Sequence, residues 1–496
     1  MSASQPGEGA MPPEGLGYDP RLYNADLAPV PSSLRNWSWL NMSTVWMGMV
    51  HNVVAYEAAA GLISMGMSAM QAIAAVAVAY FMLFLAMWFN AKAGTRHGVP
   101  FCVLVRSPFG PFGANVPVVI RGVVAMFWYA VQVYAGSQAI NAILSTLWTP
   151  WAHFNAGFLG MPANGWLSMG LFLMLHALVV SHGVHRIRNF ELIAGPLVIL
   201  VGVIATIWGL HEAHGLGPIF SQPSKLHGTD GALTFAIGVT GMIGIWSTFA
   251  VNIPDLSRFV RTQRDQVLGQ LIGLPITAIV FTLMSVIVTS ATIIAFGKPI
   301  WDPVKLLLAI DNPVVTVLGG LVIILATLSV NVAANIMPAA YDLVNLFPRR
   351  LNFNRAAMLV LFAGLLYVPW YWFQNATTIF HALEIIAGLL GPVTGIMLVD
   401  YFVLHGQQYD IDALYRYSET LHGRYGINPA GFYAMGIAGA LAIVGFFVPE
   451  LSAMADFSWF IGVLVGGGLY WVFGRAAATR AAGLSSGPAE LASEPE

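Results

Sequence analysis

Charge is scarce in this chain of 496 residues. Asp, Glu, Lys and Arg together make up 9% of it, apolar residues make up 57%, and the mean hydropathy is +0.72. A soluble domain carries roughly 25% charged residues. The composition therefore excludes an ordinary soluble protein and predicts an integral membrane protein in a lipid bilayer. The 21 basic and 23 acidic residues nearly balance, so no excess of positive charge indicates a nucleic acid as partner.

Several features of enzymes and ATP-driven pumps are also missing. The single cysteine, Cys102, excludes an intramolecular disulfide. No phosphate loop of the form G-x-x-x-x-G-K-S/T occurs, which argues against ATP-driven transport. No nucleophile with a matching base and no set of metal ligands stands out. We therefore expect neither an enzyme nor a bound metal or organic cofactor.

Long apolar runs dominate what is present. Twelve of them reach the length of about 20 residues that a helix needs to cross a bilayer. They are 37–64, 70–90, 114–148, 163–182, 190–210, 231–252, 267–297, 313–346, 355–375, 378–402, 431–448 and 456–475. Twelve crossings predict an all-α membrane protein with both chain ends on one side.

The basic residues of the loops identify that side. Counted for a cytoplasmic N-terminus, the outer loops hold only Lys225, Lys298 and Lys305, and the other eighteen of the 21 Lys and Arg lie in inner segments. Positive charge collects on the cytoplasmic side, so we expect both termini there, in an inner (plasma) membrane.

Three longer segments lie outside the predicted spans. Residues 1–36 are polar and have no apolar core, so we expect a cytoplasmic segment instead of a signal peptide. Residues 403–430 read as a polar cytoplasmic loop before a last pair of spans within 431–475. Residues 476–496 have the composition of a disordered cytoplasmic tail.

The sixth span contains an unusual set of glycines. Residues 231–260 include Gly238, Gly241 and Gly244. Each glycine weakens a helix by about 1 kcal/mol relative to alanine, and interrupted membrane helices commonly line a binding site. The pattern predicts a broken helix, although glycines at this spacing also let a neighbouring helix pack closely.

The first span is unusual in its polar residues. Gly48, His51, Asn52 and Glu57 all fall at a depth where polar side chains are rare and usually face a cavity or another helix. If spans one and six begin two repeats of five helices, both are interrupted at corresponding positions. We therefore predict that helices 1 and 6 are broken at one shared site.

Aromatic and carboxamide side chains mark that site further. Trp128 and Gln132 are four residues apart and share a helical face, Trp246 follows the glycines, and Asn331 and Asn335 lie in span eight. Indole rings provide stacking surfaces, and a carboxamide can both donate and accept hydrogen bonds. Without a basic cluster, this set suits a flat, neutral heterocycle. Each residue alone could instead serve helix packing.

Short motifs of the chain resemble those of a known family. They are Asn24-Ala-Asp-Leu-Ala-Pro29, Arg35-Asn-Trp37, Trp128-Tyr-Ala-Val-Gln132, Gly244-Ile-Trp246, Asn252-Ile-Pro-Asp255, Asn331-Val-Ala-Ala-Asn335, Gly391-Pro392 and Asp400-Tyr-Phe402. In order and spacing the chain resembles the nucleobase:cation symporter-1 family over about residues 24–475. Ser221-Gln-Pro223 and Phe296-Gly-Lys-Pro-Ile-Trp301 make it most similar to the bacterial allantoin permease and hydantoin transporter branch.

The resemblance implies a fold and a substrate site. The fold is the leucine-transporter type, with inverted repeats in 37–210 and 231–402 followed by two C-terminal helices. The residues implied at the substrate are Trp128 and Trp246 on the two faces of the ring, and Gln132, Asn335 and Asn52 at its polar edge. A monomer is expected from the family alone.

The resemblance also implies a sodium site, with one departure. Its ligands would be backbone carbonyls near Gly48 and His51, the carbonyl of Ala326 and the hydroxyl of Ser329. The next position, where a second hydroxyl is expected, holds Val330. Hard cations depend on oxygen ligands, so the coupling ion is left open between Na⁺ and H⁺. Glu57 is the candidate for proton coupling, although it can equally bond a neighbouring helix.

The leading hypothesis is a secondary active transporter that imports allantoin, hydantoin or a similar ureide by cation-coupled alternating access. The alternative within the family is a uracil, cytosine or purine permease, because two indoles and several carboxamides suit those rings too. A channel would require rings of charge or a carbonyl filter motif, and a receptor would require a large soluble domain. The sequence shows neither.

Overall fold

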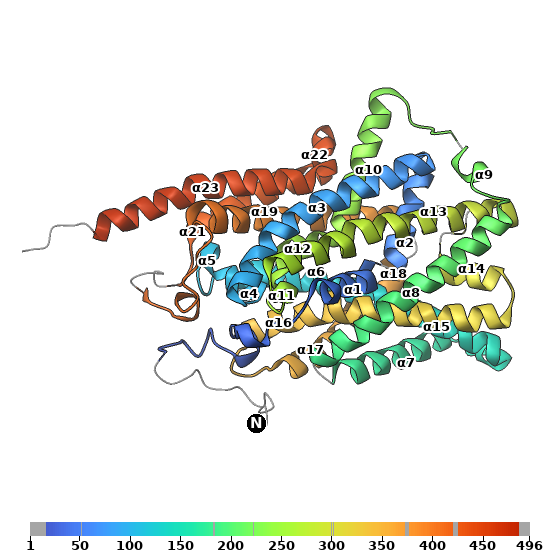
Figure 1. The fold of residues 1–496 in the computed structure, drawn as a ribbon, viewed down its shortest axis with the longest axis horizontal. Helices are drawn as coiled ribbons and strands as arrows, with labels where there is room; N and C mark the ends of the chain where they lie inside the picture. The colour runs from blue at the N-terminus through green and yellow to red at the C-terminus, as the bar shows by residue number, and fades with distance from the viewer. Residues whose placement is uncertain are drawn as a thin grey trace, which may run out of the picture.

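A computed structural model describes residues 16–485 apart from 51, 182–183, 222, 299, 301, 373–375 and 420–424. The described part is helical almost throughout, with a single small antiparallel ribbon of β1 (Gly157–Phe158) and β2 (Met161–Pro162). The long helices lie side by side along the long axis of the molecule (Figure 1). The first described residues and the C-terminal end of α23 (Ser458–Ser485) lie at the same end in this view, as an even number of crossings requires.

The remaining helices fall into long and short ones. The long ones are α3 (Ala69–His97), α6 (Asn115–Leu147), α7 (Ala163–Val180), α8 (Val184–Glu212), α10 (Gly228–Asn252), α13 (Thr277–Phe296), α15 (Pro313–Val330), α19 (Ala376–Val399) and α21 (Pro429–Ile443). The short ones are α1 (Trp39–Val50), α2 (Val53–Ser64), α4 (Phe101–Leu104), α5 (Arg106–Phe109), α9 (Gly217–Phe220), α11 (Pro254–Ser257), α12 (Gln263–Leu271), α14 (Pro303–Ala309), α16 (Met337–Leu346), α17 (Phe353–Ala363), α18 (Pro369–Trp372) and α22 (Ser452–Asp456). Three π-helical segments extend longer helices, namely η4 (Ile272–Ile276), η5 (Asn331–Ile336) and η7 (Asp400–Leu404).

Each predicted span overlaps helix in the structure, but their number is not confirmed. Among the described residues eight helices are long and apolar enough to cross a membrane, and a ninth is added if the pair around α22 and α23, bent by 80°, counts as one. In the first, fifth and ninth predicted spans, the apolar helix among the fully described residues is shorter, namely Val54–Ile63, Pro196–Glu212 and Phe353–Tyr367. Twelve crossings remain a prediction.

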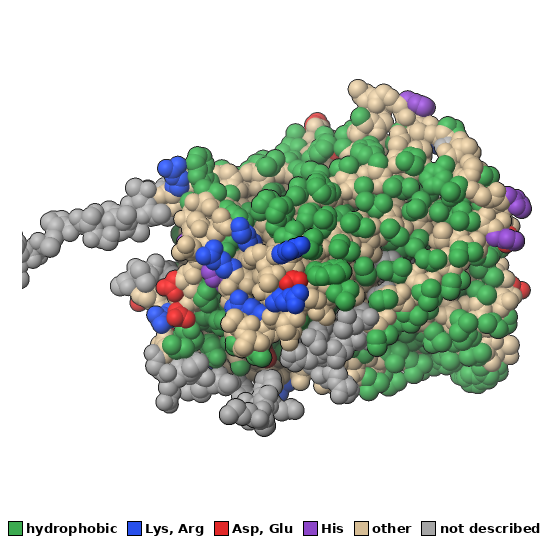
Figure 2. All heavy atoms as spheres, in the orientation of Figure 1, with side chains coloured by type: hydrophobic (Ala, Val, Ile, Leu, Met, Phe, Trp, Pro, Cys, Tyr) green, Lys and Arg blue, Asp and Glu red, His purple; other side chains and the backbone are tan. Residues whose placement is uncertain are grey.

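The surface divides into an apolar belt and a basic end. Large apolar side chains lie exposed on several helices, including Phe81, Leu178, Leu318 and Leu464. Figure 2 shows hydrophobic side chains covering the middle of the molecule, whereas Lys and Arg gather at one end. This is the distribution that a bilayer and the loop charges lead one to expect.

The first predicted span is divided between two helices in the structure. α1 ends at Val50 and α2 begins at Val53, and between them Asn52 has an extended backbone (φ −129°, ψ 161°). Its side chain accepts a hydrogen bond from the backbone N–H of Ala55 at 3.0 Å. Asn52 is therefore the N-cap of α2, a position where asparagine is among the preferred residues.

The sixth span is different from the prediction. α10 runs without interruption from Gly228 to Asn252, straight through the glycines. A Cβ on Gly238 would lie 2.6 Å from Cε of Met67 and 2.9 Å from Cδ2 of Leu62. Close packing against the end of α2 and the turn after it therefore accounts for this glycine, and the expected break at these glycines is wrong.

Past the end of α10, the basic end of the molecule has a polar interior. Asp255 accepts a hydrogen bond from the backbone N–H of Phe101 at 2.8 Å, so it caps α4. Arg121 of α6 and Asp342 of α16 form a buried ion pair, with NH1 of the arginine 3.2 Å from Oδ2 of the aspartate. The first contact joins α11 to α4, and the second joins α6 to α16.

Candidate functional site

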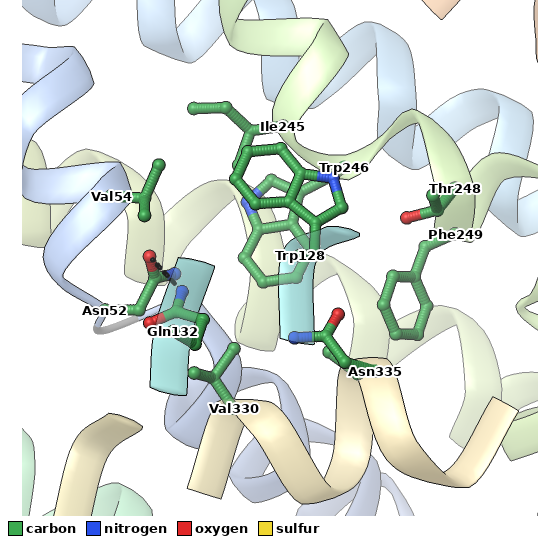
Figure 3. A pocket seen from close by; sticks show the side chains of 11 residues that line it. Asn52, Val54, Trp128, Gln132, Ile245, Trp246, Thr248, Phe249, Val330 and Asn335 are labelled. Carbon is green, nitrogen blue, oxygen red and sulfur yellow. Dashed lines mark hydrogen bonds between the residues drawn. The ribbon is translucent and has the colours of Figure 1, made fainter. Parts of the chain in front are cut away.

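One cavity collects all five residues that the sequence proposes for substrate contact. Around it lie Asn52, Val54, Trp128, Gln132, Ile245, Trp246, Thr248, Phe249, Val330, Ala334 and Asn335. Figure 3 shows the two indoles one behind the other in this view, with the carboxamides of Asn52, Gln132 and Asn335 on one side of them. Residues that are up to 283 positions apart, Asn52 and Asn335, thus share one site.

Four segments build the walls. α6 places Trp128 and Gln132 on one face because they are one helical turn apart. α10 contributes Ile245, Trp246, Thr248 and Phe249. The remaining polar wall comes from the break between α1 and α2 and from the π-helical segment η5. Local π-helix often marks functional sites, because the extra residue in the turn redirects side chains.

The cavity is small in this structure. Its volume is about 20 Å³, which is room for roughly one water molecule. Sites that enclose small organic ligands usually measure roughly 300–1,000 Å³. A heterocycle can therefore enter only when the walls move apart, which is what alternating access requires of a substrate site.

The carboxamides of Asn52 and Gln132 are joined to each other. Nε2 of Gln132 donates to Oδ1 of Asn52 at 3.1 Å, and Nδ2 of Asn52 donates to the carbonyl of Met49 at 2.8 Å. Oε1 of Gln132 is buried and has no hydrogen-bond partner among the described residues. An unpaired buried acceptor costs roughly 1–3 kcal/mol, so this oxygen is ready to receive a donor from a ligand.

Aromatic side chains support the other wall. Trp246 packs edge-on against Trp46 of α1 at a centroid distance of 5.7 Å and against Phe249 at 5.8 Å. Nε1 of Trp128 is buried without a hydrogen-bond partner in the described part of the chain. None of the eleven lining residues is charged, so the site suits a neutral ligand.

The expected cation site can be described only in part. Gly48, Ala326 and Ser329 are buried, and none of them lines the cavity. His51 and the side chain of Glu57 lie outside the described residues. Val330 lines the cavity together with the five residues proposed for substrate contact. The assignment of these residues to a cation stays a prediction.

Five lining residues were missed by sequence reasoning: Val54, Ile245, Thr248, Phe249 and Ala334. Four are apolar and look like any other membrane-facing or core residue. Phe249 follows Trp246 by three residues and Ile245 by four, and this helical spacing is the one signal that could have identified Ile245 and Phe249.

Comparisons with known proteins identify the family of the chain. A family described as "Permease for cytosine/purines, uracil, thiamine, allantoin" matches residues 29–462. The chain belongs to this permease family. The predicted membership is thereby confirmed, and with it a multi-pass membrane transporter that handles a small molecule.

Two relatives and one solved structure show how close the likeness is. The allantoin permease of Bacillus subtilis is 42% identical over 452 residues, covering 90% of this chain and 91% of the relative. The purine-uracil permease of Arabidopsis thaliana is 34% identical over 494 residues, covering 95% and 80%. Mhp1, a nucleobase-cation-symport-1 family transporter in a closed conformation with bromovinylhydantoin bound, has a TM-score of 0.77 at 24% identity, covering 92% of this chain and 96% of that chain. This match confirms the all-helical transporter fold of the permease.

Proposed function

We propose that this permease imports a flat, neutral ureide or hydantoin, with allantoin as the first candidate, by cation-coupled alternating access. The observation that carries the proposal is the uncharged cavity between Trp128 and Trp246 with three carboxamides at its edge. The relative with 42% identity over nine-tenths of the chain is an allantoin permease, which favours a ureide over a nucleobase. The chain has no catalytic role in this proposal.

We extend the proposal to the arrangement in the cell. The permease works in the plasma membrane as a monomer, with both termini in the cytoplasm, and binds no nucleic acid. The basic end in Figure 2 is then the cytoplasmic end. Residues 37–210 and 231–402 form the two inverted repeats, and the polar contacts of Arg121, Asp342 and Asp255 lie on the inner side of the site.

Substrate uptake is the direct test. Cells that express the chain receive labelled allantoin, with unlabelled hydantoin, uracil, cytosine or hypoxanthine as competitors. Cells that express the Trp128→Ala variant at the same membrane level are the matched control. We expect accumulation above the external concentration, inhibited by hydantoin and only weakly by the nucleobases.

Each other outcome has a defined meaning. Entry that stops at equal concentrations would contradict a symporter and indicate a uniporter or channel. If the cells exclude allantoin but accumulate uracil, cytosine or a purine, the ureide proposal fails and the nucleobase alternative takes its place. The purine-uracil permease relative is the reason to include those competitors.

A further inference from the structure

His176 of α7 does not line the cavity, yet a continuous chain of hydrogen bonds joins it to Asn335, which does. We propose that His176 is a positioning residue: acting through Asn331, it holds Asn335 with its carbonyl oxygen toward the ligand. The site then selects ligands that offer an N–H donor at this point. The inference rests on the proposed function, because it specifies how the same cavity recognises its heterocycle.

The first link determines which nitrogen of His176 carries the proton. Nδ1 lies 2.9 Å from the backbone carbonyl oxygen of Phe172. A carbonyl oxygen can only accept, so Nδ1 is the protonated nitrogen and donates. In the neutral ring Nε2 is then an acceptor, and Nδ2 of Asn331 donates to it at 3.1 Å.

The second link determines the orientation of Asn331. The amide nitrogen and oxygen of an asparagine can be told apart only by their partners. Nδ2 of Asn331 also lies 3.3 Å from the backbone carbonyl of Tyr129, which again can only accept. Two acceptors on one side leave Oδ1 of Asn331 facing Asn335.

The third link reaches the ligand site. Nδ2 of Asn335 donates to Oδ1 of Asn331 at 2.8 Å. Oδ1 of Asn335 therefore points the other way, and Figure 3 shows this oxygen directed toward Trp246. Asn335 meets a ligand with an acceptor, because a flipped amide would place its oxygen against Oδ1 of Asn331, which is itself an acceptor.

Packing keeps His176 in place. The ring is completely buried, and it lies edge-to-face on Phe172 at 4.5 Å and on Tyr129 at 5.6 Å between centroids. Gly136 of α6 makes the approach of α7 feasible, because a Cβ there would lie 2.3 Å from Cε1 of Phe172. The histidine thus has no room to rotate away from Asn331.

The carboxamide of Gln132 also presents its oxygen to the ligand, for an independent reason. Oδ1 of Asn52 accepts the backbone N–H of Ala55, so the Gln132 atom that bonds Asn52 is its nitrogen and Oε1 remains as an acceptor. Two acceptor oxygens suit a ligand with two N–H groups. The –NH–CO–NH– unit of a ureide or hydantoin has this pattern, and methylation of one nitrogen removes it.

The experiment compares hydantoin with its 1-methyl and 3-methyl derivatives as inhibitors of labelled substrate uptake. We expect His176→Leu to weaken inhibition by hydantoin about tenfold, since the loss of one aligned hydrogen bond to a buried group is worth about 1–2 kcal/mol. Inhibition by the methylated derivative that binds weakly to wild type should change little in this variant. The ratio between the two inhibitors therefore falls toward one, with membrane level and maximal rate retained.

Four further variants keep the result specific. His176→Gln retains an acceptor for Asn331 and should restore most of the discrimination. Asn331→Leu should reproduce the loss, and the double variant should be no worse than Asn331→Leu alone, because both act through one chain. His211→Leu, whose side chain is 85% exposed outside the spans, is the matched control.

The outcomes separate the two proposals. If wild type responds to neither allantoin nor hydantoin, the proposed function fails and this inference falls with it. If wild type discriminates and His176→Leu and Asn331→Leu both keep the ratio unchanged, only the positioning role of His176 is overturned. Additive losses in the double variant would likewise contradict a shared chain.

Discussion

Nε2 of Gln132 donates a hydrogen bond to Oδ1 of Asn52 across 3.1 Å, although 80 positions separate the two residues. The bond ties the unbroken helix α6 to the break between α1 and α2. Because the same Asn52 oxygen also caps α2, the substrate wall and the start of the second half-helix depend on one side chain.

Asn52 can therefore be dissected with two variants. Asn52→Ala should lower the stability of the purified protein by about 1 kcal/mol, the usual value of an N-cap. Asn52→Ser retains a capping oxygen, but serine is too short to reach Gln132. We expect only the alanine variant to have a lower unfolding temperature than wild type. Both variants should raise the KM of uptake. Equal unfolding temperatures in the two variants would argue against the cap.

A stacking face and the polar edge of the site should both be indispensable. Trp128→Ala and Asn335→Ala should abolish uptake with the protein still present in the membrane, because a stacked ring contributes about 1–3 kcal/mol of binding. Trp471→Ala is the control, since that indole is 44% exposed on α23. Uptake and membrane level are measured together. Normal transport by either site variant would place the substrate elsewhere.

Sodium should not be required. Val330 offers no oxygen ligand, and its side chain faces the heterocycle cavity, so replacing sodium by choline should leave wild-type uptake unchanged, whereas a protonophore should reduce it. Val330→Thr supplies a hydroxyl at almost the same volume and tests whether a ligand oxygen there introduces sodium stimulation. A steep sodium dependence of wild-type uptake would contradict the prediction.

The ion pair between Arg121 and Asp342 should matter most when only one partner is removed. The two side chains are 0% and 3% exposed. Arg121→Leu leaves a buried carboxylate without its cation, which costs about 3–5 kcal/mol. The double variant Arg121→Leu with Asp342→Leu should be distinctly more stable than Arg121→Leu. Denaturation of the purified proteins measures the free energy of unfolding. If the double variant loses as much as the two single variants together, the two groups act independently.

One stability contribution should depend on pH. The hydrogen bond from His405 to Asp400, with their charge attraction, raises the pKa of His405 above its ordinary 6.5, although partial burial opposes this. Asp400 also accepts from Ser107 at 2.6 Å and from Tyr470 at 2.7 Å, so the histidine joins a contact between three parts of the chain.

The sign follows from the direction of the shift. A raised histidine pKa stabilises the fold fully below pH 6.5, and this contribution is lost as pH rises through the folded-state value. Wild type should therefore melt above His405→Gln at low pH, and the difference should shrink as pH increases. A difference that stays constant or grows with pH would contradict the assignment.

The site was largely predictable because its residues are chemically out of place. Tryptophans and carboxamides stand out in apolar helices, and Trp128 and Gln132 share a face by their spacing alone. The proposed positioning role of His176 could not be predicted from the sequence. It depends on a contact between α7 and η5, 155 positions apart in the chain, and no spacing rule connects them.

The glycines of span six show the opposite case. Their helix-weakening tendency correctly marks them as unusual, but it does not say whether the helix breaks. Contact with Met67 and Leu62 shows that Gly238 serves close packing, and α10 continues through it. In span one the break does occur, and there a local signal exists, because asparagine can cap the helix that follows.

Composition and residue spacing alone predicted a membrane protein, the order of its apolar helices and a candidate set of residues for a flat, neutral ring. These follow from transfer energies and from side-chain chemistry, which each residue carries wherever it lies. The extended backbone at Asn52, the place of Val330 on the cavity wall and the unpaired oxygen of Gln132 became visible only in the packed helices. Those properties depend on hydrogen bonds and contacts between distant residues, whose geometry exists only once the helices have packed.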